Sequence, residues 1–179
     1  RRADLAGHLN TVIFLPEDVG LLGGPPTGRR HRLDDLLSQL YPEYVTALAR
    51  YQSALTRRNV LLRHLRERGG DRAQLEPLES ILAQTGVLLA VYRQRAIIAL
   101  SLHADRFHQE LTGGKAWLQL QYRAGFAAAQ PQAVQYRLAL AAEQIPQQHA
   151  DLDGLETLYR ETLRKERDKE LLRGITLTG

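Results

Sequence analysis

A glycine-rich stretch near the N-terminus comes close to the pattern of a phosphate-binding loop. Residues 23–30 read GGPPTGRR, so two arginines follow the last glycine. A phosphate-binding loop needs a lysine for the terminal phosphates and a hydroxyl for magnesium at those two places. The two prolines also remove amide donors that would surround the anion. The pattern therefore argues against a nucleotide site in this loop.

The two arginines at the end of that stretch lie where a helix is expected to begin. A positive charge is unfavourable at a helix N-terminus, so Arg29 and Arg30 indicate an anionic partner. Structural pairing with Glu17, Asp18 or Asp34 is favoured over contact with DNA phosphates.

A second group of basic side chains lies toward the end of the first long helix that the sequence predicts. Only Glu67 adds a negative charge among them, so this region is distinctly basic. Such a run is more often a solvated face than a binding site. If DNA contacts the chain, however, we expect it to do so here, through phosphates rather than bases. The candidate DNA-binding residues are Arg57, Arg58, Arg63, Arg66 and Arg68.

No arrangement of residues typical of catalysis or of a metal site appears elsewhere. His103 and His108 are five residues apart, or about 140° around a helix, so they do not converge on a metal. The chain has no cysteine, so a zinc site would need histidine and carboxylates alone. Trp117 fits a core or interface position. We expect no catalytic residue, metal or cofactor in this chain itself.

Two long helices joined by a tight turn should position the basic group. Apolar residues recur at spacings of three and four, with one polar break at Arg58, which is typical of a coiled-coil seam. The sequence Gly69-Gly70-Asp71 predicts the turn, because glycine can adopt the left-handed cap and Asp71 can cap the next helix. We expect an antiparallel hairpin with its tip near residues 69–71. The seam residues are Tyr44, Leu48, Tyr51, Leu55, Arg58, Leu62 and Leu65 in the first arm, and Leu75, Leu78, Leu82, Thr85, Leu89, Tyr92, Ala96 and Ala99 in the second.

The remaining segments predict shorter helices and three β-like runs. Helices are expected at 29–40, 132–144 and 151–173, and strands at 10–15, 116–122 and from Ile175 to Thr178. The last helix should bury Leu152, Leu155, Tyr159, Leu163 and Leu172. The fold class is therefore mainly α, with a helical hairpin and short flanking strands.

Composition sets the class of protein. The chain has 179 residues, 44% of them hydrophobic, with a net charge of +4 and a pI near 9.6, which is compatible with nucleic acid. All but three of its 24 basic residues are arginine, a bias that phosphate binding or a GC-rich genome would explain equally. Its apolar runs are shorter than a membrane span and no signal-peptide pattern is present, so we expect a cytoplasmic protein. The absence of methionine suggests a piece of a longer protein.

A specific motif lies between the first β-like run and the hairpin. It reads P-E-D-x-x-L-L-x-G-x-P-x-x-R-R-x-x-L-D and resembles the signature of the RecF recombination-repair family. The matching residues are Pro16, Glu17, Asp18, Leu21, Leu22, Gly24, Pro26, Arg29, Arg30, Leu33 and Asp34. The similarity continues through residues 39–62, at Gly86 and Arg93, through 111–122 and in the terminal RGITLTG. Arg32 departs from it, because the family usually has an aromatic residue there.

The resemblance implies an ABC-type ATPase of the structural-maintenance-of-chromosomes class. Such proteins bind DNA as ATP-dependent dimers and, with RecR and RecO, help to load RecA at gaps. ATP and magnesium would belong to the parent protein, because the ATPase motifs of the family are not in this chain. The expected organisation is then the edge of an ATPase head at 1–24, a helical arm at 25–112, and a strand with return helices at 113–179.

Two functions remain open at this level. The arm would contact DNA directly, or it would serve only in dimerisation or RecR binding. An independent enzyme is disfavoured because no catalytic pattern was found.

Overall fold

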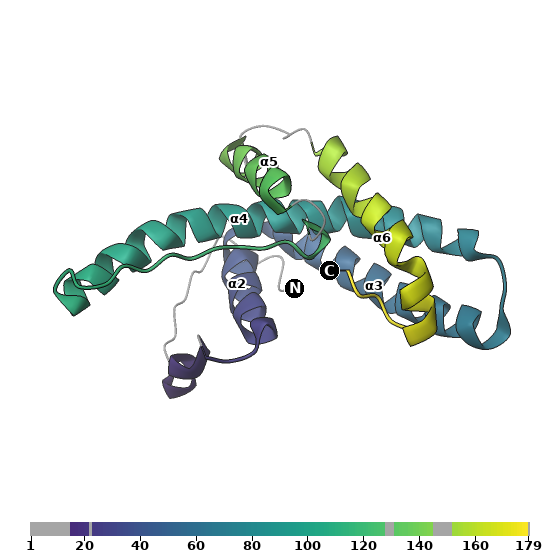
Figure 1. Cartoon of the computed structure of the whole chain (residues 1–179), viewed down its shortest axis with the longest axis horizontal. Helices are drawn as coiled ribbons and strands as arrows, with labels where there is room; N and C mark the ends of the chain where they lie inside the picture. Colours follow the sequence, from purple (N-terminus) through teal and green to yellow (C-terminus); the bar gives the residue numbers. More distant parts are fainter. Residues whose placement is uncertain (1–14, 22, 128–130, 145–151, 179) are drawn as a thin grey trace. The chain divides into compact units, whose positions relative to one another are not determined.

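The computed structural model describes residues 15–21, 23–127, 131–144 and 152–178 (Figure 1). It is mainly helical, as expected, and no strand occurs in these ranges. Two compact units divide the chain, Arg1–Thr46 and Ala47–Gly179, and the boundary falls inside a helix. The elements are η1 (Pro16–Leu21), α2 (Pro26–Leu40), α3 (Pro42–Arg68), η2 (Arg72–Leu75), α4 (Glu76–Thr112), η3 (Gly125–Ala127), α5 (Pro131–Gln144) and α6 (Asp153–Arg173).

The first unit is organised by α2. This helix begins at Pro26, three residues before the predicted start at Arg29. Proline's fixed φ and missing amide suit the first position of a helix. After α2 ends, Tyr44 in the first turns of α3 donates its hydroxyl proton to Asp34 Oδ1, 2.5 Å away. Both side chains are buried. This hydrogen bond explains why the motif carries a carboxylate at the end of its sequence.

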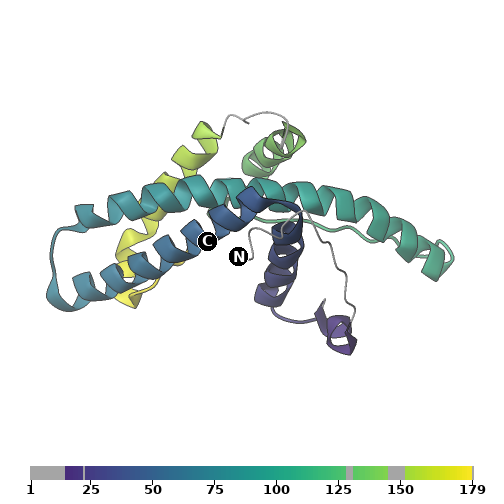
Figure 2. The ribbon, with the colours of Figure 1, turned by 180° about the vertical axis from the view of Figure 1, so that it is seen from behind.

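The predicted hairpin is present in the second unit. Residues 47–68 of α3 run antiparallel to the first half of α4, as Figures 1 and 2 both show. At the tip, Gly69 and Gly70 have φ of 69° and 131°, values that favour glycine. Asp71 accepts a hydrogen bond from the Ala73 amide at 2.8 Å, capping η2 rather than α4 itself.

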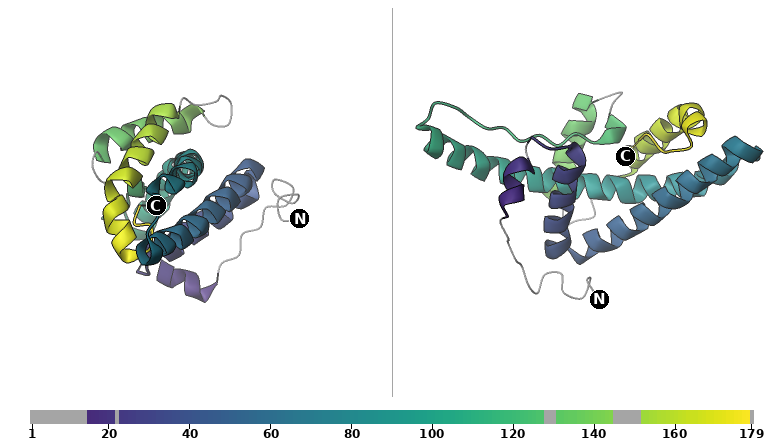
Figure 3. Two further views of the ribbon diagram at one scale, coloured as in Figure 1. Left: turned by 90° about the vertical axis from the view of Figure 1, so that its right-hand side faces the viewer. Right: turned by 90° about the horizontal axis from the view of Figure 1, so that it is seen from below.

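The helix α4 is the core of the second unit. Both α5 and α6 pack against it, and Figure 3 shows them beside it from two further directions. Buried residues therefore occur on several of its faces between Leu78 and Gln94. Residues 72–112 include an 18-residue window with a mean hydropathy of 1.2, which by length and composition alone would suffice to cross a membrane. Of that window, 44% is buried inside the protein, and core helices reach the same length and hydropathy.

The expected strand at residues 116–122 is wrong. The segment is extended, but it runs back along α4 instead of pairing with a strand (Figure 1). The amide of Leu118 donates to Asp105 Oδ1 at 2.8 Å, and that of Leu120 to Ser101 Oγ at 3.3 Å. Side chains of α4 thus satisfy amides that a sheet would otherwise pair.

The expected strand from Ile175 to Thr178 is also an extended segment without a strand partner in the described structure. Most of the run at 10–15 lies outside the described residues.

In α6, Leu155, Tyr159 and Leu163 are buried as expected, but Leu172 is 79% exposed and Leu171 is buried instead. Leu172, nine residues after Leu163, points about 180° away from it around the helix, whereas Leu171 is only about 80° away.

Candidate nucleic-acid interface

The structure separates the five arginines that the sequence grouped together. Arg57, Arg63, Arg66 and Arg68 are exposed on α3, whereas Arg58 has no exposed surface. Arg66 and Arg68 also lie in the last turn of α3, where positive charge stabilises the helix dipole.

Arg58 is unavailable to DNA, because it occupies the polar break in the heptad seam and points into the unit. Its Nη2 atom lies 2.9 Å from Glu79 Oε1 and 2.7 Å from Glu170 Oε2. Its Nη1 atom donates to Thr176 Oγ1 at 2.8 Å. A buried guanidinium needs such partners, since an unpaired charge in the interior is very unfavourable. The expectation that Arg58 contacts DNA is therefore corrected.

Glu79 joins a second arginine to this buried ion cluster, which consists of Arg58, Glu79, Arg167 and Glu170. Arg167 donates from Nε to Glu79 Oε1 at 2.9 Å and from Nη2 to Oε2 at 2.5 Å. Burial raises the pKa of Glu79, but hydrogen bonds from Arg167 and Arg58 outweigh it and hold that pKa below its usual value. Two positive and two negative charges compensate one another, so the cluster adds no net charge.

The cluster is not perfectly satisfied. Arg58 Nε has no hydrogen-bond partner, and Glu170 Oε2 contacts Arg58 closely without an aligned hydrogen bond. The short distance makes this an ion contact, whose energy comes from charge rather than from hydrogen-bond geometry.

The same cluster holds the C-terminal segment. Asn59 Oδ1 accepts from the amide and the hydroxyl of Thr176, at 2.8 and 2.7 Å. Glu170 Oε1 accepts from the Leu177 amide at 2.7 Å. Residues from α3, α4, α6 and the last described segment thus meet at one buried polar centre.

Sequence reasoning missed the partners of Arg58. Glu79 offered a signal, because this acidic residue lies between Leu78 and Leu82 on the inner face of the predicted second arm. Glu170 and Arg167 gave none, since the same pattern of charges fits the exposed face of a surface helix.

Arg63 and Arg66 lean over the end of α6. A Cβ atom added to Gly174 would lie 2.8 Å from Arg63 Cγ and 3.0 Å from Arg66 Nη1. Gly174 is the left-handed cap of α6, with φ of 66°. The two cationic side chains therefore lie where the helix dipole places partial negative charge.

The motif residues of the first unit form local contacts. Asp18 accepts from the Leu15 amide at 2.9 Å and forms an ion pair with Arg32. The backbone hydrogen bond from Leu15 is the largest cause of its lowered pKa, and Arg32 adds to it. Arg29 donates to the Gly24 carbonyl oxygen at 2.7 Å. Asp18 thus pairs with Arg32, the one departure from the family pattern, whereas Arg29 and Arg30 were the expected partners.

Two other motif residues lie on the surface of the first unit. Arg30 is exposed, and so is Pro26 at the start of α2. The side chain of Glu17 lies outside the described part of the structure.

Gly86 lies where three helices cross. A Cβ atom there would be 2.5 Å from Tyr159 Cε1 and 3.0 Å from Tyr51 Cε2. The hydroxyls of Tyr51 and Tyr159 share a hydrogen bond of 3.1 Å, and Tyr159 stacks on Phe126 with ring centroids 4.6 Å apart. Burial raises the pKa of Tyr159 well above its usual value. These contacts explain a glycine in the middle of a long helix.

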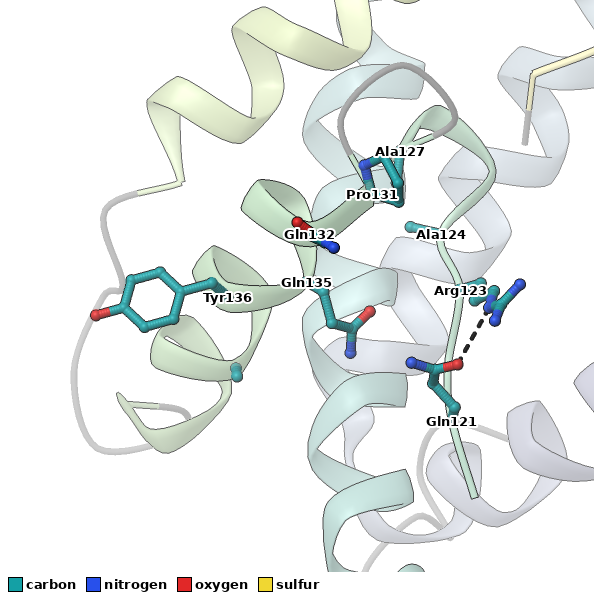
Figure 4. A pocket seen from close by; sticks show the side chains of 9 residues that line it. Gln121, Arg123, Ala124, Ala127, Pro131, Gln132, Gln135 and Tyr136 are labelled. Atoms are coloured by element: carbon teal, nitrogen blue, oxygen red, sulfur yellow. Dashed lines mark hydrogen bonds between the residues drawn. The ribbon is translucent and has the colours of Figure 1, made fainter. Parts of the chain in front are cut away.

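A surface hollow of about 780 Å³ lies between the segment after α4 and the start of α5 (Figure 4). Among the side chains that line it, Arg123 carries the only charge, and it donates to Gln121 Oε1 at 3.1 Å. This lining offers no acid–base pair or nucleophile for catalysis. Nor do the described residues contain a group of three or more histidines and carboxylates that could hold a metal ion.

Comparison with known proteins places this geometry in context. No protein-family model matches the chain. The RecF of Heliobacterium modesticaldum, a DNA replication and repair protein, is 35% identical over 179 residues, covering 100% of this chain and 43% of that protein. The RecF of Chloroflexus aurantiacus is 45% identical over 129 residues, covering 69% of the chain and 33% of that protein. The chain belongs to the RecF family.

Solved structures of RecF show the same fold. The recombination mediator protein RecF-ATPrS in the RecFOR pathway superposes with a TM-score of 0.81 at 24% identity, over 99% of this chain and 42% of that one. A structure of RecF-ATP gives a TM-score of 0.79 at 23% identity. The chain therefore spans less than half the length of the RecF proteins that it matches, and the motif, the hairpin and the return helices all belong to the shared part.

Proposed function

We propose that this chain is the arm of a RecF-type DNA replication and repair protein and that the tip of its hairpin contacts DNA. The observation that carries the proposal is the group of exposed arginines near the tip. Arg57, Arg63 and Arg68 form no ion pair with any described residue, and Arg66 has only an exposed neighbour, Glu67, at 3.3 Å. Unneutralised guanidinium groups favour phosphate over any neutral ligand.

The activities of the whole protein extend the proposal. Its parent would bind DNA as an ATP-dependent dimer and, with RecR and RecO, help to load RecA at gaps in the cytoplasm. ATP and magnesium would be bound by parts of the parent outside this chain, which would not hydrolyse ATP alone. The names of the solved relatives, which include ATP and the RecFOR pathway, support this extension.

The salt dependence of duplex binding tests the contact at the tip. We expect full-length protein with serine at Arg57, Arg63, Arg66 and Arg68 to bind a labelled duplex more weakly. The slope of log K against log salt should flatten by about 0.9 for each phosphate contact that is lost. Fluorescence anisotropy with ATP present measures both quantities. An unchanged affinity and slope would exclude the tip as a DNA surface.

A protein-binding arm is the second candidate, and the far half of α4 together with the segment after it favours this role. Phe107, Leu111 and Trp117 are 58%, 87% and 74% exposed, which is unusual for such large apolar side chains in one region. A partner protein such as RecR, or a second protomer, would bury them. This alternative predicts binding that persists in high salt and is lost when Phe107 and Leu111 become serine, with duplex binding unchanged.

A further inference from the structure

Four basic residues form a straight row along α3. The first three are spaced seven residues apart, which is nearly two helical turns, so all three point within about 40° of one another. The fourth follows four residues later, on the same face. All four are exposed, and we call them the outer row: Arg50, Arg57, His64 and Arg68.

The outer row lies on a different face from the other exposed arginines of the tip. The buried residues Ala54, Arg58 and Leu62 mark the core-facing side of α3. The row flanks that side, whereas Arg63 and Arg66 lie on the opposite flank, against Gly174. The basic tip therefore consists of two surfaces, and one of them is already occupied by the end of α6.

The row carries uncompensated charge. Residues 47–66 of α3 contain no Asp or Glu. None of the four side chains forms an ion pair or side-chain hydrogen bond with another described residue. Some basic residues elsewhere in the unit do have acidic neighbours: Arg72 lies 2.8 Å from Asp168, and Lys169 lies 2.9 Å from Glu166. The absence of such neighbours on this face indicates an anionic partner from outside.

The chemistry of the row favours a nucleic acid over an acidic protein. Its three arginines offer planar forks that suit phosphate oxygens. From Arg50 to Arg68 the row extends about 27 Å on a rigid helix, most of one turn of a duplex. Val60, 54% exposed between Arg57 and His64, is the one large apolar side chain that is exposed along residues 50–68, which is less than the apolar, aromatic-rich centre that a protein interface needs. We propose that α3 lays the outer row along the phosphate backbone of a duplex, so that contact extends well beyond the tip.

This inference rests on the proposed function, and it is tested by variants that separate the two faces. In full-length protein, Arg57→Ser/Arg68→Ser removes two charges from the row, and Arg63→Ser/Arg66→Ser removes two from the opposite flank. The row pair should flatten the salt slope of duplex binding by about 1.8, and the control pair should change it little. If both pairs changed the slope equally, the inference that the outer row lies along the duplex would be overturned.

Arg50 supplies the sharper test, because it lies outside the basic tip. Arg50→Ser should flatten the slope by about 0.9, and Arg50→Lys should keep the slope, since the charge remains. Melting temperatures should match the wild type, because these side chains are exposed. An unchanged slope for Arg50→Ser, or a loss of binding to polyglutamate rather than to duplex, would overturn the inference. Wild-type protein that binds no duplex would instead overturn the proposed function itself.

Discussion

At the scale of single residues, Arg58 shows how a charge can be mistaken for a surface feature. Its heptad position was visible in the sequence as a polar break, and the core position follows from that spacing. Its partners did not follow, because Glu170 lies far away in the chain and no local rule relates the two. Composition treats a buried arginine and an exposed one alike. The heptad position separates Arg58 from Arg57, and the packing of α6 against α4 supplies the carboxylates that Arg58 needs.

Replacing Arg58 with methionine should destabilise the protein strongly. The change leaves Glu79 with one arginine and Glu170 with none, both in the interior. Removing one partner of a buried ion pair typically costs about 3–5 kcal/mol. Urea unfolding followed by circular dichroism measures the loss. Arg57→Met, at the exposed neighbouring position, is the matched control and should stay within about 0.5 kcal/mol of wild type. Comparable losses in the two variants would contradict the buried cluster.

Gly86→Ala should also be destabilising, although alanine is the better helix former by about 1 kcal/mol. The added methyl would lie 2.5 Å from Tyr159 Cε1, and overpacking of this kind costs about 1–3 kcal/mol. Thermal unfolding should show the lower stability. In a Tyr159→Ala background the same substitution should cost much less, because the closest clash is gone and only the contact with Tyr51 Cε2 at 3.0 Å remains. If Gly86→Ala lowers stability equally in both backgrounds, the ring is not the cause.

At the scale of elements, periodicity was a good guide to helices and a poor guide to strands. The heptad seam and the glycines at the tip predicted the hairpin. Glycines in the left-handed conformation end α4 and α6. The alternation in residues 116–122 looked the same as that of a strand, because period two describes any extended segment with one covered face. Here the helix α4 covers that face, and nothing in the local sequence distinguishes packing on a helix from pairing with a strand.

Asp105 should be the residue that fixes this segment to α4. Asp105→Ala removes the acceptor of the Leu118 amide, a hydrogen bond worth about 1 kcal/mol. Hydrogen exchange at Leu118 should then accelerate about fivefold, if exchange occurs by local opening. Glu110→Ala on the same helix disturbs only an exposed pair with Arg106, so it should leave Leu118 unchanged. Equal exchange in all three proteins would mean that other contacts hold the segment.

At the scale of the whole molecule, stability should depend on the charge state of the buried ion cluster. The pKa of Glu79 is lowered in the folded state, so its contribution is present above the usual value of 4.5 and is lost as pH falls below it. The free energy of unfolding should therefore decrease below about pH 4.5, with less change from Glu79 between pH 5 and 7. Glu79→Gln should be less stable at neutral pH but should show a shallower decrease in acid. If Glu79→Gln lost as much stability in acid as the wild type does, other carboxylates would be responsible for the effect.

The buried cluster also constrains how this family can change through mutation. Each of its four charges depends on the others, so a single substitution passes through a protein with an uncompensated interior charge. Related sequences should therefore retain Arg58, Glu79, Arg167 and Glu170 as a set, or replace the set together with apolar residues. The exposed arginines of α3 carry no such mutual dependence, and they are free to move from one helical position to another while the positive face persists.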